Sequence, residues 1–171
     1  MKTVKHTLSF YISVFSLALA LFVFDSTGIL TLNLGTLHPL TLIPLLVAVG
    51  LTAREWAGLM LGTLFGVLLD ITASGSYFFN LITLAVIGCV CGLLSSYRVN
   101  DNIYSALALS FFASISYFSL KWVCFCLIPA HRDVWGYLLK YALPSAIYTA
   151  LFVIPFYYLI KYISKKTHYI I

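Results

Sequence analysis

Long apolar stretches dominate this chain and leave little room for any other kind of segment. The stretch from Tyr104 to Ile128, for example, contains a single charged residue, Lys121. A helix needs about 20 apolar residues to cross the roughly 30 Å hydrocarbon core of a bilayer. The whole chain is 62% apolar and 9% charged over 171 residues, whereas a soluble domain is about a quarter charged. A soluble globule of this size could not bury so much apolar surface, so we predict an all-α integral membrane protein.

Six apolar segments can be drawn, and they predict one transmembrane domain over residues 1–171 with short loops. The predicted spans are residues 8–24, 37–52, 56–71, 78–97, 104–128 and 141–160. The first span continues through Leu21–Phe24 after Ala18-Leu19-Ala20, a possible cleavage site, where a signal peptide should turn polar. We therefore interpret it as a retained anchor.

The distribution of Lys and Arg predicts the orientation of the helices. With the N-terminus in the cytoplasm, seven of these residues fall inside: Lys2, Lys5, Arg54, Arg98, Lys161, Lys165 and Lys166. Arg132 and Lys140 fall outside. Both termini are therefore predicted to be cytoplasmic. The ten basic residues form no continuous stripe, which argues against nucleic acid as a partner and leaves membrane lipids.

The segment Leu30–Gly35 alternates apolar and polar residues with a period of two. An extended segment on the outer surface of the membrane and a loosely ordered apolar loop both fit this pattern.

The third span carries glycine at every fourth position, and Asp70 follows at the next step. Gly58, Gly62, Gly66 and Asp70 therefore share one face of a helix. In lipid, this spacing lets a second helix backbone approach closely. The fourth span carries Gly88 and Gly92, so we predict that the two helices pack as an antiparallel hairpin; a face for a partner helix is the alternative.

Asp70 is the one acidic residue that falls inside an apolar span, where a carboxylate is costly without a partner. Counted along the third and fifth spans at about 1.5 Å per residue, Asp70 and Lys121 reach similar depths in the outer half. We predict an Asp70–Lys121 ion pair. The alternative places Asp70 at the outer interface, where it caps the loop through Thr72 and Ser74.

No pattern of catalytic or metal-ligating residues stands out. Cys89 and Cys91 are two apart, as are Cys124 and Cys126, so the members of each pair point to different sides of a helix. The two pairs also lie at different depths, which disfavours a disulfide or a tetrahedral metal site. We interpret the cysteines as small buried apolar residues, and predict a protein that is not an enzyme and has no cofactor.

The sixth span contains Pro144 and Pro155, and both are predicted to kink it. With Tyr148 and Thr149 between the prolines, this helix could line an outward-facing groove.

The third and fourth spans resemble the MreD family, small membrane proteins of the bacterial rod-shape machinery. Three stretches carry the resemblance: Pro39–Leu46, Ala57–Gly75 with its glycine repeat and Asp70, and Asn80-Leu81 before Gly88 and Gly92. Leu143–Tyr148, with Pro144, also fits a closing helix introduced by proline. Two positions depart from the family pattern. Phe78-Phe79 stands where smaller residues including glycine are expected, and Thr149 stands where Asn is common.

This resemblance implies a non-enzymatic component of the cell-elongation complex in the bacterial cytoplasmic membrane. Its implied partners are an MreC-like protein and the rod-complex peptidoglycan synthase, with an indirect link to MreB filaments. Gly58, Gly62, Gly66 and Asp70 would then be structural determinants of the bundle.

Six short helices are also the layout of the substrate-binding subunit of energy-coupling-factor vitamin transporters, the alternative function. That protein would hold a small molecule in an outer pocket near Asp70, Trp122 and Trp135. The outer polar residues are few, whereas a vitamin site needs converging hydrogen-bonding groups.

Overall fold

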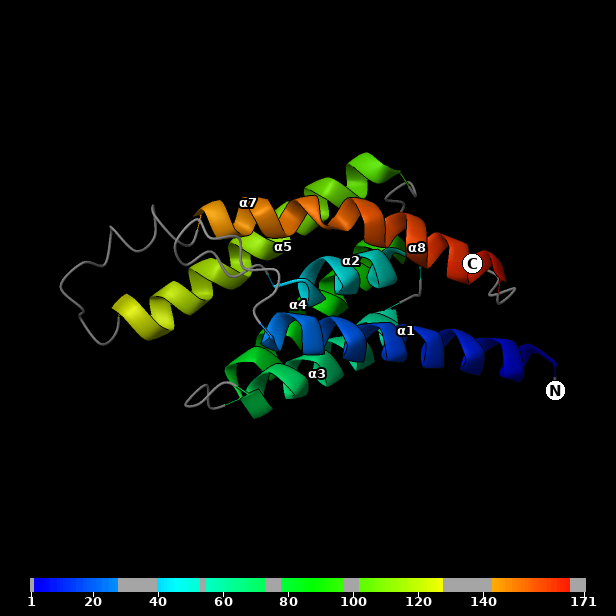
Figure 1. Ribbon diagram of the computed structural model, residues 1–171. Helices are drawn as coiled ribbons and strands as arrows, with labels where there is room; N and C mark the ends of the chain where they lie inside the picture. The colour runs from blue at the N-terminus through cyan, green and yellow to red at the C-terminus, as the bar shows by residue number, and fades with distance from the viewer. Residues whose placement is uncertain are drawn as a thin grey trace.

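The chain forms a bundle of helices, and a computed structural model describes residues 2–27, 40–52, 55–72, 78–96, 102–127 and 143–166 (Figure 1). The helices are α1 Lys2–Ser26, α2 Leu42–Thr52, α3 Glu55–Thr72, α4 Phe79–Ser96, α5 Ile103–Trp122, α7 Leu143–Leu151 and α8 Val153–Lys166. A π-helical turn, Val123–Leu127, extends α5. The all-α prediction is confirmed for the described residues, which contain no strand. The segment Leu30–Gly35 lies outside them.

Three helical segments are long and apolar enough to cross a membrane: Ser9–Ser26, Ile103–Phe125 and Leu143–Lys166. Helices α3 and α4 have 18 residues each, about 27 Å of helix. Many outward-facing side chains are large and apolar, such as Ile12, Met60 and Phe112, each about three-fifths exposed or more. Water would drive such a surface to associate, whereas hydrocarbon would solvate it.

The short helix α2, of eleven residues, lies at the centre of the bundle (Figure 1). All eleven of its residues are buried, from Leu42 to Thr52. Its sequence, LIPLLVAVGLT, has no polar face to turn outward, and a helix that is apolar all round belongs in an interior. Eleven residues reach only about 16 Å, half the thickness of a bilayer core. The predicted span over residues 37–52 is therefore a short internal helix where the structure describes it.

The two ends of α2 are held by side chains from other helices. At its start, Asp25 of α1 accepts hydrogen bonds from the Thr41 amide and hydroxyl, and Thr149 of α7 accepts one from the Leu40 amide at 3.4 Å. At its end, the Ser95 hydroxyl of α4 donates to the Leu51 carbonyl at 2.8 Å. Because the first N–H and last C=O groups of a helix have no partner within it, these contacts satisfy backbone groups at both ends of α2.

Helices α7 and α8 form one bent helix with the break at Phe152. Pro155 has no N–H to donate to the Leu151 carbonyl, and its ring crowds that carbonyl. The Phe152 amide instead bonds the Thr149 carbonyl, three residues back, at 3.2 Å. The position of this break fits the kink predicted from Pro155.

Pro144 corrects a prediction, because it lies in the first turn of α7 rather than in a helix interior. A proline there removes no helical hydrogen bond, so it starts the described helix and does not kink it. Thr149 is also fully buried against the start of α2, and the Tyr148 ring packs edge-on against Phe152. Thr149 therefore does not line an outward-facing groove.

Candidate functional site

The glycine stripe of α3 lies directly against α4. A Cβ added at Gly58 would overlap the carbonyl oxygen of Gly88, and one at Gly62 would overlap that of Leu84. A Cβ at Gly66 would overlap the Leu81 backbone. These contacts run in opposite order along the two helices, so α3 and α4 are antiparallel and meet backbone to backbone. The face of α3 considered as a surface for a partner helix is thus occupied by α4.

The second glycine of α4 has a different neighbour from the first. Gly88 meets Gly58 of α3, whereas Gly92 lies beside Gly50 of α2, where an added Cβ would come within 3.6 Å of the Gly92 amide nitrogen. The same added Cβ would lie 2.9 Å from the Cβ of Cys91. Gly50 therefore lets the internal helix approach α4, a role that sequence reasoning did not assign to it.

Asp70, at the C-terminal end of the glycine stripe, caps the start of α4. Its Oδ1 accepts hydrogen bonds from the amide nitrogen of Asn80 at 3.3 Å and from Asn80 Nδ2 at 2.8 Å. Its Oδ2 accepts one from the Leu81 amide at 2.9 Å. The first N–H groups of a helix have no partner within it, and a carboxylate there both accepts their bonds and opposes the positive end of the helix dipole.

Tyr117 of α5 extends this network to a third helix. Its hydroxyl donates to Asn80 Oδ1 at 2.6 Å, and the whole side chain is buried. The Tyr117 ring also packs against Phe79, with centroids 6.0 Å apart. Asp70, Asn80 and Tyr117 therefore tie α3, α4 and α5 together at one level of the bundle. We call these three residues the Asp70 cluster.

Lys121 lies one turn beyond Tyr117 on α5, with its Nζ 6.0 Å from the centre of the Tyr117 ring. Asp70 and Lys121 thus approach the Asn80–Tyr117 contact from two different helices. The Asp70–Lys121 ion pair stays a prediction. The alternative was that Asp70 caps the following loop through Thr72 and Ser74. The Thr72 hydroxyl donates instead to the Leu69 carbonyl at 3.1 Å, and Ser74 lies outside the described residues.

Asp25 forms the counterpart of Asp70 at the start of α2, and sequence reasoning did not single it out. Its Oδ2 accepts hydrogen bonds from the Thr41 amide at 3.1 Å and the Thr41 hydroxyl at 2.9 Å. Its Oδ1 is buried and has no hydrogen-bond partner among the described residues. The available signal was Thr41 immediately before the apolar run of α2, because threonine is favoured at helix starts.

The cysteines lie in different environments. Cys91 is buried beside Gly50, Cys89 is half-buried and Cys124 is exposed, so the prediction of small buried residues is wrong for Cys124. The Cys126 side chain is outside the described part. Among the described residues, no group of three or more His, Cys, Asp or Glu side chains could hold a metal ion.

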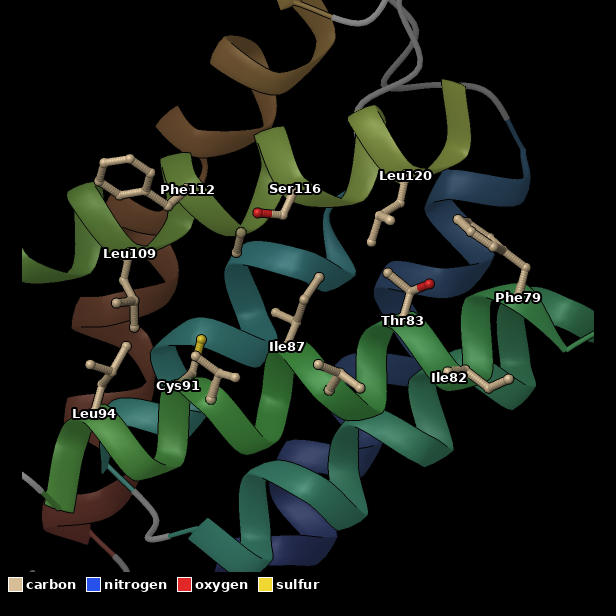
Figure 2. Close-up of a pocket in the computed structure, with 13 residues that line it drawn as sticks. Phe79, Ile82, Thr83, Ile87, Cys91, Leu94, Leu109, Phe112, Ser116 and Leu120 are labelled. Atoms are coloured by element: carbon tan, nitrogen blue, oxygen red, sulfur yellow. The ribbon is translucent and has the colours of Figure 1, made fainter. Parts of the chain in front are cut away.

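A groove of about 460 Å³ separates α4 from α5 (Figure 2). Its lining is almost entirely apolar, and the hydroxyl groups in it come from Thr83 and Ser116. The Asp70 cluster contacts the groove residue Phe79 through the Tyr117 ring, and neither Asp70 nor Trp122 is among the lining residues. Trp135, the third residue of the expected vitamin pocket, lies outside the described residues.

Comparison of the chain with protein-family models, with curated proteins and with solved structures finds no match.

Proposed function

We propose that this chain is a multi-pass protein of the bacterial cytoplasmic membrane, with both termini in the cytoplasm, that acts in the cell-elongation complex. It works without catalysis, by contact with other membrane proteins. Its partners are an MreC-like protein and the rod-complex peptidoglycan synthase, and MreB filaments connect to it indirectly.

One observation carries the proposal. Most of the residues that carry the resemblance to the MreD family lie between Gly58 and Gly92, and they form one structural unit. The glycine stripe packs α3 on α4, Asp70 at the end of the stripe bonds Asn80, and Tyr117 joins that contact to α5. A motif that serves helix packing fits a protein whose packed helices present their outer surfaces to partners.

The vitamin-transporter alternative has less support from the described groove. A binding site for a polar vitamin needs several converging hydrogen-bonding groups, and this groove offers two hydroxyls and the thiol of Cys91.

Depletion of the protein from its own bacterium tests the proposal. We expect depleted cells to lose a rod shape and become round, and the wild-type gene to restore it. Leu64→Ala should also restore rods, because Leu64 is an exposed residue of α3, whereas Asp70→Ala should not. Cells that keep their shape on depletion, together with a purified protein that binds a vitamin, would support the transporter instead.

A further inference from the structure

The C-terminal half of α8 carries a charged face that the bundle leaves uncovered. The buried residues of α8 recur at helical spacing: Val153, Phe156, Tyr157, Ile160 and Ser164. Because a helix turns once in about 3.6 residues, Tyr158, Tyr162 and Lys165 fall on the opposite side. Lys161 and Lys166 flank them. The two tyrosines are 60% and 66% exposed, and Lys165 and Lys166 are exposed as well. We call these five residues the basic face of α8.

The lysines of this face have no counter-charge in the described part of the chain. Lys161 is half-buried, and its ammonium group lies against Tyr157, 3.3 Å from the hydroxyl oxygen and 5.3 Å from the ring centre. This contact orients Lys161 without neutralising it. Lys165 and Lys166 form no ion pair with a described residue. Positive charge gathered on one exposed face attracts an anionic partner.

Both termini of the chain add to the charge at this end of the bundle. Figure 1 shows the start of α1 and the end of α8 at the same end, and the two helices contact each other. Helix α1 begins at Lys2, and Lys5 follows one turn later. The basic face of α8 therefore lies at the end of the bundle where two more lysines enter α1.

The exposed residues of the bent helix α7–α8 change character in a fixed order. Leu151 is apolar and 54% exposed, Tyr158 and Tyr162 follow it, and Lys165 and Lys166 end the helix. From Leu151 to Lys166 the helix rises about 22 Å. Half of a bilayer, from its midplane to the water side of the headgroups, also measures about 20–22 Å. Hydrocarbon, interface and headgroups succeed one another over this distance, in the order in which leucine, tyrosine and lysine are favoured.

This order selects a lipid over a protein as the partner. An acidic segment of a soluble protein would meet the lysines but would leave the exposed leucine and tyrosines without a role. A second copy of the chain, related by a two-fold axis through this face, would bring like charges together. An anionic lipid meets both the charge and the order of the residues.

We propose that the basic face of α8 binds the headgroups of anionic phospholipids. The lysine ammonium groups donate to phosphate oxygens, and the tyrosine rings lie where the acyl chains meet the headgroups. With both termini in the cytoplasm, as proposed above, these lipids belong to the cytoplasmic leaflet. The preference for anionic lipid depends neither on that orientation nor on a role in cell elongation, so the two proposals can fail separately.

The test measures the melting temperature of the full-length protein in a neutral detergent while phosphatidylglycerol or phosphatidylcholine is added. A lipid that binds the folded protein raises this temperature, and the concentration needed for a given rise reports the affinity. We expect phosphatidylglycerol to give the same rise as phosphatidylcholine at a lower concentration. Because salt screens exposed charges, this difference should disappear in about 1 M salt.

Replacing the two exposed lysines should remove most of the preference. A lysine near an anionic membrane surface strengthens binding about fivefold. Lys165→Gln together with Lys166→Gln should therefore need about 25-fold more phosphatidylglycerol for the same rise, and as much phosphatidylcholine as the wild type. Lys165→Arg together with Lys166→Arg keeps the charge and should need no more of either lipid.

A matched control separates this face from the net charge of the protein. Lys121→Gln removes one charge from α5, where Lys121 lies beside Tyr117. It should leave the phosphatidylglycerol requirement unchanged, whereas Lys165→Gln alone should raise it about fivefold.

Three results would overturn the proposal. The first is an equal phosphatidylglycerol requirement in Lys165→Gln and Lys121→Gln. The second is an equal rise with inorganic phosphate, which would make a free anion the ligand. The third is an unchanged requirement in the double glutamine variant together with the loss of a co-purifying membrane protein, which would make a protein the partner. If the double variant melts below the wild type before lipid is added, the salt series on the wild type decides, and a preference that survives about 1 M salt contradicts the proposal.

Discussion

The helix pairs α1–α2 and α3–α4 both place an aspartate at the end of the first helix and bond it to the start of the second. Asp70 uses both carboxylate oxygens, on three N–H donors of Asn80 and Leu81. Asp25 uses one oxygen, on Thr41, and leaves the other buried without a partner among the described residues. Below the cap the pairs also differ, because α3 and α4 meet through glycines while α2 is surrounded by several helices.

This difference shows two ways to end a helix inside a bundle. The α3–α4 pair is a local unit, in which the glycine stripe and the cap lie within one hairpin. The start of α2 is held from α1 and α7, over sequence separations of 16 and 109 residues. A substitution in the α3–α4 pair should therefore disturb one contact surface, whereas a substitution at the start of α2 should disturb its packing against several helices.

The largest effect is expected at the glycine contact of α3 with α4. Gly62→Ala would gain about 1 kcal/mol from helix propensity alone. We nevertheless expect the free energy of unfolding to fall by about 3 kcal/mol, because the new Cβ overlaps the Leu84 backbone and the helices must separate. Detergent titration of the purified protein measures the change. Leu64→Ala is the control on the exposed side of α3, and an equal loss in both variants would contradict backbone packing.

Replacing each aspartate by asparagine should lower the unfolding free energy by different amounts at the two caps. Asp70→Asn places an amide NH₂ against an N–H donor, and should cost about 2 kcal/mol of unfolding free energy. Asp25→Asn can place its NH₂ where Oδ1 now lies, and should cost about 1 kcal/mol or less. The same titration applies to both variants. Equal losses would mean that the two caps do not differ in the way their hydrogen bonds indicate.

Tyr117→Phe should have a smaller effect, since it removes one hydroxyl and leaves the ring contact with Phe79 in place. We expect a loss of about 1 kcal/mol, the contribution of a single hydrogen bond to Asn80. Tyr148→Phe serves as the control on α7. A loss in Tyr117→Phe no greater than that of the control would show that α5 adds no stability through the Asp70 cluster.

An effect of similar size is expected at Phe78, the residue before α4. Its φ of 63° is left-handed, a region that costs most L-residues about 1–2 kcal/mol and costs glycine little. Phe78→Gly should therefore be more stable than Phe78→Ala by about 1 kcal/mol, in the same unfolding assay. If alanine is the more stable of the two, the left-handed backbone is absent in solution.

The helices of this bundle could be predicted from the sequence because their apolar runs are long and their ends are marked by polar residues. Sequence reasoning also placed the glycine face of α3 against α4, where Gly58 meets Gly88, but the predicted partner Gly92 lies beside Gly50 of α2. The burial of α2 was not predicted, because composition gives the length of an apolar segment and not what surrounds it.

The polar contacts were harder to predict, because they depend on how distant segments pack. The bond between Asp70 and Asn80 crosses a turn, and that between Tyr117 and Asn80 joins positions 37 residues apart. No spacing rule links Asp25 to Thr41 or Thr149 to Leu40. Lys121 was chosen as the partner of Asp70 by depth alone. Depth could not identify Asn80 and Tyr117, whose contacts with Asp70 and with each other depend on the packing of three helices.

The most direct test of the Asp70 cap exchanges the two charges. In Asp70→Lys with Lys121→Asp, any ion pair between the positions is kept with its sign reversed, but lysine cannot accept hydrogen bonds from Asn80 and Leu81. The unfolding free energy of this double variant, measured beside each single variant, gives the answer. A capping role predicts that the exchange stays well below wild-type stability, because the Asn80 and Leu81 donors still have no acceptor at position 70. Recovery of wild-type stability by the exchange would contradict the cap and establish the ion pair as the function of Asp70.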